Sequence, residues 1–157
     1  MKKIKLTKGK YALVDDEDFD YLNQWRWCDS HGYAMRSQYL GGGRKNGKSK
    51  SIFMHRVVMK VEDKNTKDID HINRNRADNR KSNLRFCTPS QNLANSKLRT
   101  TNKSGYSGIR FSNRYHKFEV RIKKEGKAYT KVFENLKKAI KWQKEKYKEL
   151  FGEFSPI

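Results

Sequence analysis

Cysteine is scarce in this chain, which has only Cys28 and Cys87. They lie far apart and form no C-x-x-C pair, so the sequence favours neither a zinc cluster nor a disulfide framework, and both are expected as small buried side chains. Long apolar runs are also missing, because no stretch approaches the ~20 residues that cross a bilayer. The first ten residues lack the apolar centre of a signal peptide. We therefore expect a cytoplasmic, intracellular protein with no membrane partner.

Acidic residues are few beside the basic ones, with 17 Asp and Glu against 37 Lys and Arg and a formal net charge of +20. Such a field attracts polyanions, because neutralised phosphates release their condensed counterions. Nucleic acid is therefore the first partner to consider, and the charge alone does not distinguish double-stranded DNA from RNA. Hydrophobic residues make up 34% of the chain, yet 3 Trp, 8 Tyr and 8 Phe can fill compact cores. The composition therefore indicates a folded, nucleic-acid-binding protein.

The first third of the chain reads as short strands and turns. Strands are expected at residues 4–6, 11–14, 25–28 and 32–36, with a short helix after Val14 through Leu22. The stretch SIFMHR, residues 51–56, predicts another strand, which continues into a short helix at residues 57–60. GGGRKNGKSK, residues 41–50, is rich in glycine but lacks the G-x-x-x-x-G-K-[ST] spacing of a nucleotide cradle, so it is interpreted as a flexible basic loop.

The last third has the pattern of a small sheet covered by one helix. Small polar and basic residues at 97–104 mark a linker. In KFEVRI, residues 117–122, Phe118, Val120 and Ile122 alternate with polar residues, which predicts one covered and one open face. Apolar residues then repeat at helical spacing from Leu136 to Leu150. Residues 97–150 hold 17 Lys and Arg against 5 Glu, so the basic excess is strong here.

The stretch DIDHINRNRADNR carries a carboxylate, Asp70, beside an imidazole, His71. Hydrolysis of a phosphodiester needs a base to activate water and a hard cation to neutralise developing charge, and these two residues suit those tasks. Thr88 and Gln91 form a T-x-x-Q capping box with Pro89 between them, so a helix is expected to begin there and to carry Asn92 on its first turn. The Asn-rich residues between these two parts favour a loop that is rigid without an apolar core.

These residues resemble the HNH homing endonucleases of phages and mobile introns. The resemblance includes the run from Asp70 to Asn73, then Asp78-Asn79, the run Ser82 to Arg85, and the run Thr88 to Asn92. It implies a ββα-metal fold in which His71 is the general base and Asp70 and Asn92 hold the metal. It also implies that Asn83 is the middle asparagine of the motif, which pins the connecting loop. The expected location is a bacterial host or a phage-infected cell.

The last motif position is Asn92 here, where many relatives have histidine. A carboxylate and an amide oxygen make a hard, all-oxygen site, which favours one Mg²⁺ or Mn²⁺ ion per active site over zinc.

The C-terminal part resembles a second family, the AP2/ERF-type DNA-binding domains. The segments SGYSGIRF, KFEVRI and KAYTKVF and the final helix carry this resemblance over residues 104–152. It implies that the sheet lies in the major groove of DNA. With Lys117 added from the alternation of the strand, the expected DNA contacts are Arg110, Lys117, Arg121, Lys123, Lys127 and Tyr129.

Together the patterns predict an α+β fold: a nuclease domain over residues 1–96 with its ββα-metal core at about 52–96, a linker over 97–104, and an AP2-like domain over 105–152. We expect a monomer that nicks duplex DNA at a long target site. The alternatives are a DNA-binding regulatory protein without catalysis and an RNA-directed protein. His55 either orients the site or contacts phosphate, or is a buried core histidine, and the sequence leaves these readings open.

Overall fold

The computed structural model describes residues 1–42, 47–61, 67–98 and 100–155. The middle of the predicted basic loop, residues 43–46, and residue 99 of the predicted linker lie outside the described residues. The chain folds as two compact units, residues 1–86 and 87–157. Both combine small sheets with few helices, so the expected α+β class is confirmed. Among the described residues no helix is both long and apolar enough to cross a membrane.

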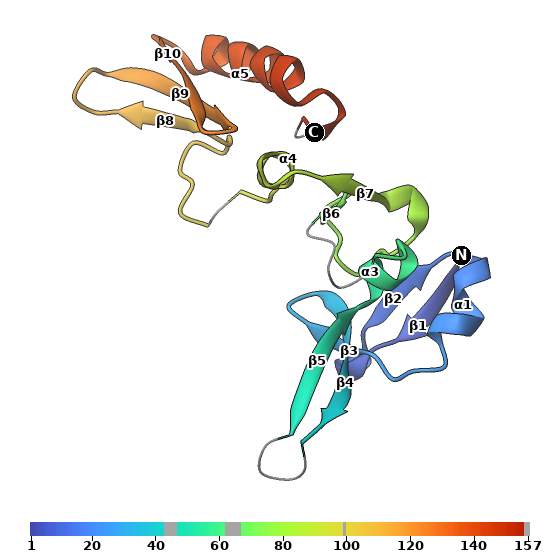
Figure 1. Cartoon of the computed structure of the whole chain (residues 1–157). Helices are drawn as coiled ribbons and strands as arrows, with labels where there is room; N and C mark the ends of the chain where they lie inside the picture. The colour runs from blue at the N-terminus through green and yellow to red at the C-terminus, as the bar shows by residue number, and fades with distance from the viewer. Residues whose placement is uncertain (43–46, 62–66, 99, 156–157) are drawn as a thin grey trace. The chain divides into compact units, whose positions relative to one another are not determined.

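The first unit is built from short strands and three small sheets (Figure 1). Its strands are β1 (Lys2–Lys5), β2 (Tyr11–Val14), β3 (Cys28–Ser30), β4 (Tyr33–Gly41), β5 (Lys48–Phe53), β6 (Asp68–His71) and β7 (Leu84–Cys87), whose last residue belongs to the second unit. Its helices are α1 (Asp16–Leu22), α3 (Met54–Val58) and the 3-10 turns η1 (Thr7–Gly9) and η2 (Lys81–Asn83). β1 pairs with β2, the order β3-β4-β5 forms a second sheet, and β6 pairs with β7.

The core of the first unit is built from buried side chains of β1, β2, α1, β4, α3, β6 and β7. Ile4 and Val14 are almost fully buried, as is Trp27, which is 2% exposed. The indole Nε1 of Trp27 donates to the Leu22 carbonyl at 2.8 Å, so the largest core side chain also has its polar atom paired. Trp25 is only half-buried.

The start of α3 differs from the sequence prediction. The strand ends at Phe53 and the helix spans Met54–Val58, so His55 lies on a helix and not on a strand. Met54 and Val58 are both buried and lie one helical turn apart. Their burial in the core favours a helix, whereas the periodicity of so short an apolar run is compatible with either a strand or a helix. A second difference is the strand expected at residues 25–28, because β3 begins only at Cys28.

The second unit has a three-stranded antiparallel sheet with one long helix against it (Figure 1). Its elements are α4 (Pro89–Ala94), β8 (Ile109–Ser112), β9 (Lys117–Lys124), β10 (Lys127–Phe133), α5 (Leu136–Phe151) and the 3-10 turn η3 (Gly152–Phe154). The strand order is β10-β9-β8. Val120 and Ile122 are buried with Ala139 and Tyr147 of α5, which confirms the predicted covered face of the sheet.

Candidate functional site

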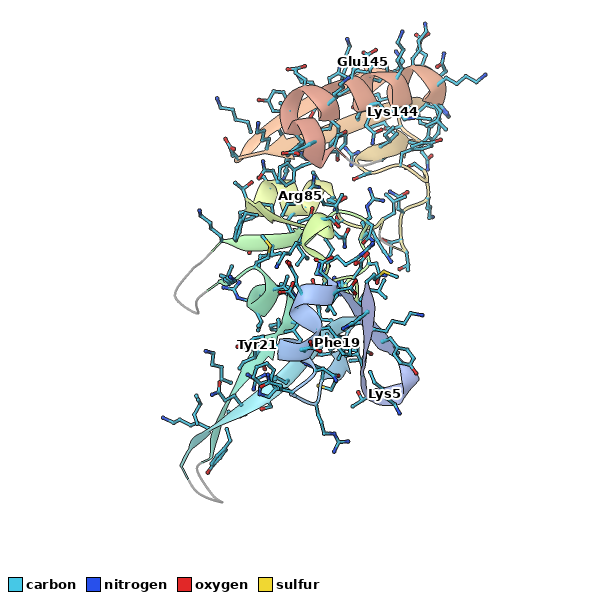
Figure 2. All side chains as sticks on the ribbon, turned by 90° about the vertical axis from the view of Figure 1, so that its right-hand side faces the viewer. Lys5, Phe19, Tyr21, Arg85, Lys144 and Glu145 are labelled. Atoms are coloured by element: carbon cyan, nitrogen blue, oxygen red, sulfur yellow. The ribbon has the colours of Figure 1, made fainter. Side chains whose placement is uncertain are left out.

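β6 presents two buried polar residues side by side in sequence. Asp70 and His71 are 6% and 4% exposed. Arg85 of β7, labelled in Figure 2, donates to Oδ2 of Asp70 from Nε at 3.0 Å and from Nη2 at 2.8 Å. The buried Asp70 carboxylate therefore has the cationic partner that a buried carboxylate needs.

The imidazole of His71 lies in a cluster of rings. Its centroid is 5.3 Å from that of His55 on α3 and 5.8 Å from that of Tyr33 on β4. Burial lowers the pKa of His71, and the Asn79 side chain and nearby carboxylates only partly oppose this shift. Burial and the neighbouring His71 lower the pKa of His55 to about 3. Both imidazoles are therefore neutral near pH 7, and a neutral imidazole can accept a proton.

The loop between β6 and β7 is held by asparagine and aspartate side chains. Oδ1 of Asn83 accepts from the Asn73 backbone N–H at 3.0 Å, and its Nδ2 donates to the Asp78 carbonyl at 2.8 Å. The buried Asp78 carboxylate accepts from Asn73 Nδ2 at 2.8 Å and from Arg80 Nε and Nη2. The hydrogen bonds to Arg80 lower the pKa of Asp78 below its ordinary value. Polar side chains thus fix the loop without an apolar core, as expected for such residues.

The same loop is fastened to the N-terminal strands. The Leu13 N–H donates to the Ala77 carbonyl and the Leu13 carbonyl accepts from the Asn79 N–H, each at 2.8 Å. The Asp15 carboxylate accepts from the Lys81 N–H at 2.7 Å, and the Lys81 ammonium pairs with acidic residues of α1. β2 and α1 therefore position the loop that follows His71.

Asn92 lies on α4, in the second unit. Thr88 accepts from the Gln91 N–H and the Gln91 side chain accepts from the Thr88 N–H, so the predicted capping box is confirmed. Among the described residues, no group of three or more His, Cys, Asp or Glu side chains is suited to a metal ion. A carboxylate and an amide oxygen still fit a hard cation such as Mg²⁺, which keeps several waters and needs few protein ligands. The metal site of Asp70 with Asn92 stays a prediction.

The sheet of the second unit presents a basic open face. Directly paired residues of antiparallel strands share a face. The register therefore groups Arg110 of β8 with Glu119, and Arg121 and Lys123 of β9 with Thr130 and Ala128 of β10. Lys117 pairs with Ser112 on this face. Four of the six predicted DNA contacts, Arg110, Lys117, Arg121 and Lys123, therefore share the open face.

Tyr129 and Lys127 lie on the other side of that sheet. Tyr129 pairs with the buried Ile122, and the Lys146 ammonium of α5 lies 4.9 Å from the centre of its ring. Lys127 pairs with Lys124, whose ammonium donates to the Leu150 carbonyl of α5. The structure therefore places these two residues on the face that α5 covers, and their role as DNA contacts stays a prediction.

Two site residues had no role assigned from sequence. Arg85 follows Leu84 in the motif, and only its pairing across β6 and β7 shows that it neutralises Asp70. Asn79 is fully buried against His71, although its sequence context suggests only a turn residue. A signal for Arg85 was present, since a lone buried aspartate on a strand requires a cation or donors nearby.

Comparisons with known proteins show which family this chain resembles. Residues 53–94 match the family model for the HNH endonucleases. A protein of Acanthamoeba polyphaga mimivirus described as an HNH endonuclease is 30% identical over 156 residues, covering 94% of this chain and 74% of that protein. Protein 3.8 of Escherichia phage T7 is 30% identical over 87 residues, covering 55% of this chain and 72% of that protein. The search of solved structures found no match. On the similarity to the mimivirus protein, which extends over nearly the whole chain, this protein belongs to the HNH endonuclease family.

Proposed function

We propose that this protein is a metal-dependent endonuclease that hydrolyses a phosphodiester bond in duplex DNA. The observation that carries the proposal is the buried pair on β6, a neutral imidazole beside a carboxylate held by Arg85. The pair precedes a loop fixed at both ends, so the catalytic group is pre-organised. The net charge of +20 supports a polyanionic substrate.

In this mechanism His71 takes the proton of a water molecule as the water oxygen attacks phosphorus. The bond from phosphorus to the 3′ oxygen breaks, and that oxygen takes a proton from solvent water, which leaves a 5′-phosphate and a 3′-hydroxyl. Asn83 keeps the loop after His71 in place through its two side-chain hydrogen bonds. An Mg²⁺ or Mn²⁺ ion held by Asp70 and Asn92 would neutralise the charge that develops on the phosphate and the leaving oxygen.

The second unit serves as a DNA-binding module of the AP2 type in this proposal. Its open sheet face carries four cations against the single carboxylate of Glu119, which pairs with Arg110 at 2.8 Å. Two linked modules make the second contact nearly intramolecular, so a long asymmetric site can be bound by two weak surfaces. With one catalytic centre per chain, a monomer nicks one strand, as a homing-type enzyme of a phage or mobile intron would.

Supercoiled plasmid DNA tests the proposal directly. Incubation with Mg²⁺ or Mn²⁺ should convert it to the open circle, and a chelator should prevent this. His71→Ala should abolish nicking, while its affinity for DNA stays within about threefold of that of the wild type, because the substitution removes only the general base. Circular dichroism should show an unchanged fold. Plasmid that stays supercoiled with and without chelator would favour a DNA-binding protein without catalysis.

Competition separates DNA from RNA as the partner. Double-stranded RNA added to a DNA-binding assay should compete poorly, since its deep, narrow major groove does not admit a sheet. Equal competition by the two polymers would count against duplex DNA as the substrate.

A further inference from the structure

Arg76 lies in the loop after His71 and is held by a turn 45 residues earlier in the chain. Its Nη1 donates to the His31 carbonyl at 3.0 Å, and its Cζ lies 4.6 Å from the centre of the Tyr33 ring. Gly32, between these two residues, lies against the Arg76 stem: a Cβ at Gly32 would lie 3.7 Å from Arg76 Cβ and Cδ, which is an ordinary contact distance. Three neighbouring residues thus hold one arginine side chain.

The turn that holds Arg76 is itself defined. The Asp29 carboxylate accepts from the Gly32 N–H at 3.1 Å, and His31 and Gly32 have positive φ angles of 51° and 87°. On the other side, the Ala77 N–H donates to Asn75 Oδ1 at 3.1 Å, so the loop backbone beside Arg76 is fixed too. Both ends of this contact are therefore ordered before any ligand arrives.

The charge of Arg76 is not neutralised within the described part of the chain. Arg80 and Arg85, in the same motif, pair with Asp78 and Asp70 at 2.6 and 2.8 Å. Arg76 is exposed, and its contacts are a carbonyl, a ring face and the Gly32 turn. Holding an exposed arginine in one place costs side-chain entropy, and no carboxylate among the described residues offsets that cost. A guanidinium in this condition is suited to a phosphate, which it binds in a fork.

Arg76 is also near His71. The Tyr33 ring, on which the guanidinium stacks, lies 5.8 Å from the His71 ring between centroids. The Tyr33 ring thus lies against both this guanidinium and the imidazole of the proposed base.

We propose that Arg76 is a catalytic residue that binds the phosphodiester undergoing cleavage, through guanidinium N–H groups pointing away from the His31 carbonyl. The inference rests on the proposed nuclease function and adds a residue to its site. Arg76 holds the phosphate against the water that His71 deprotonates and stabilises the negative charge that grows on its oxygens.

The test is the rate of plasmid nicking in single turnover, with protein in excess over its dissociation constant for the DNA. This condition separates cleavage from binding. Arg76→Ala should lower the saturated rate about 100-fold, as expected for the loss of one donor to a developing oxyanion. Arg76→Lys should recover part of it, because it restores the charge without the fork.

Arg114→Ala is the matched control. Arg114 is another exposed arginine over a tyrosine ring, 5.3 Å from the centre of Tyr115, but it lies in the β8–β9 turn. The saturated nicking rate of Arg114→Ala should stay within about twofold of that of the wild type. Equal thermal midpoints for all variants would show that folding is unchanged.

The outcomes separate this inference from the proposed function. If the wild type nicks DNA and Arg76→Ala nicks it equally fast at saturation, Arg76 does not touch the reacting phosphate. An unchanged saturated rate with weaker binding would place it on a flanking phosphate and would also overturn the inference. If the wild type binds DNA but never nicks it, the nuclease proposal fails, and the role of Arg76 fails with it.

Discussion

His55 is a buried titratable group whose protonation is linked to folding. Its pKa is lowered from 6.5 to about 3, mainly by burial among Tyr33, Phe53 and His71. Above pH 6.5 both the folded and the unfolded state hold His55 neutral, so it then makes no difference to stability. Below pH 6.5 only the unfolded state takes up the proton, so the folded state loses stability until about pH 3.

We therefore expect the free energy of unfolding to fall with decreasing pH below about 6.5. The contribution of one such histidine is at most about 1.4 kcal/mol per pH unit. His55→Phe keeps a ring in the cluster and should make the dependence shallower, as measured by urea unfolding from pH 7 to pH 4. His116→Asn, in the exposed β8–β9 turn, is the control and should follow the wild type. Parallel curves for His55→Phe and the wild type would contradict this assignment.

The β6–β7 loop depends on two hydrogen bonds of the Asn83 side chain. Removing its side chain in Asn83→Ala leaves the Asn73 N–H and the Asp78 carbonyl without their partner. An unpaired buried polar group costs about 1–3 kcal/mol, so we expect a loss of stability of this order together with slower nicking. Asn83→Asp keeps the side-chain acceptor and loses the donor. Its stability and its nicking rate should therefore lie between those of the wild type and those of Asn83→Ala. Thermal unfolding and the plasmid assay measure both effects, and an Asn83→Ala variant as stable as the wild type would remove this role.

The start of β8 depends on a close approach of two backbones. Gly108 has a φ of 70°, and a Cβ there would lie 2.5 Å from the Arg121 carbonyl oxygen. Gly108→Ala should therefore lower the stability of the second unit by more than the cost of the positive φ alone, which is about 1 kcal/mol. Gly126→Ala is the matched control, because Gly126 has a φ of 81° with nothing within 4 Å of a Cβ. Equal losses of stability for Gly108→Ala and Gly126→Ala, measured by calorimetry, would mean that β8 shifts to make room for the added methyl group.

Local chemistry predicted some of these elements and tertiary contacts decided the others. The Thr88 capping box and the alternation of Val120 and Ile122 are visible in sequence because their partners lie three and two residues away. The predicted start of α3 was wrong, because the true start of this helix depends on the burial of Met54 and Val58 in the core. The Arg85–Asp70 pair spans 15 residues, and no local pattern fixes such a distance. The face of Tyr129 follows from strand register, which composition does not determine.

At the scale of the whole molecule, DNA affinity should come from the open sheet face. Each lysine or arginine that loses a phosphate contact should lower the slope of log affinity against log salt by about 0.9. The double variant Arg121→Ala and Lys123→Ala should lower it by roughly twice that amount. Lys144→Ala, on the exposed side of α5 that Figure 2 labels, should leave the slope unchanged. Equal slopes for all proteins would place DNA on another surface.

The hydrogen bonds between Leu13 and the loop bear on how small a working fragment can be. The family match begins at residue 53, which invites excision of residues 53–94 as a minimal catalytic piece. Such a piece would lack β2, whose Leu13 pairs with Ala77 and Asn79, and Asp15, which accepts from Lys81. It would also lack Tyr33, one of the rings around His71. The first fifteen residues are therefore part of the scaffold of the β6–β7 loop, and shortening the chain from its N-terminus would release that loop before reaching any motif residue.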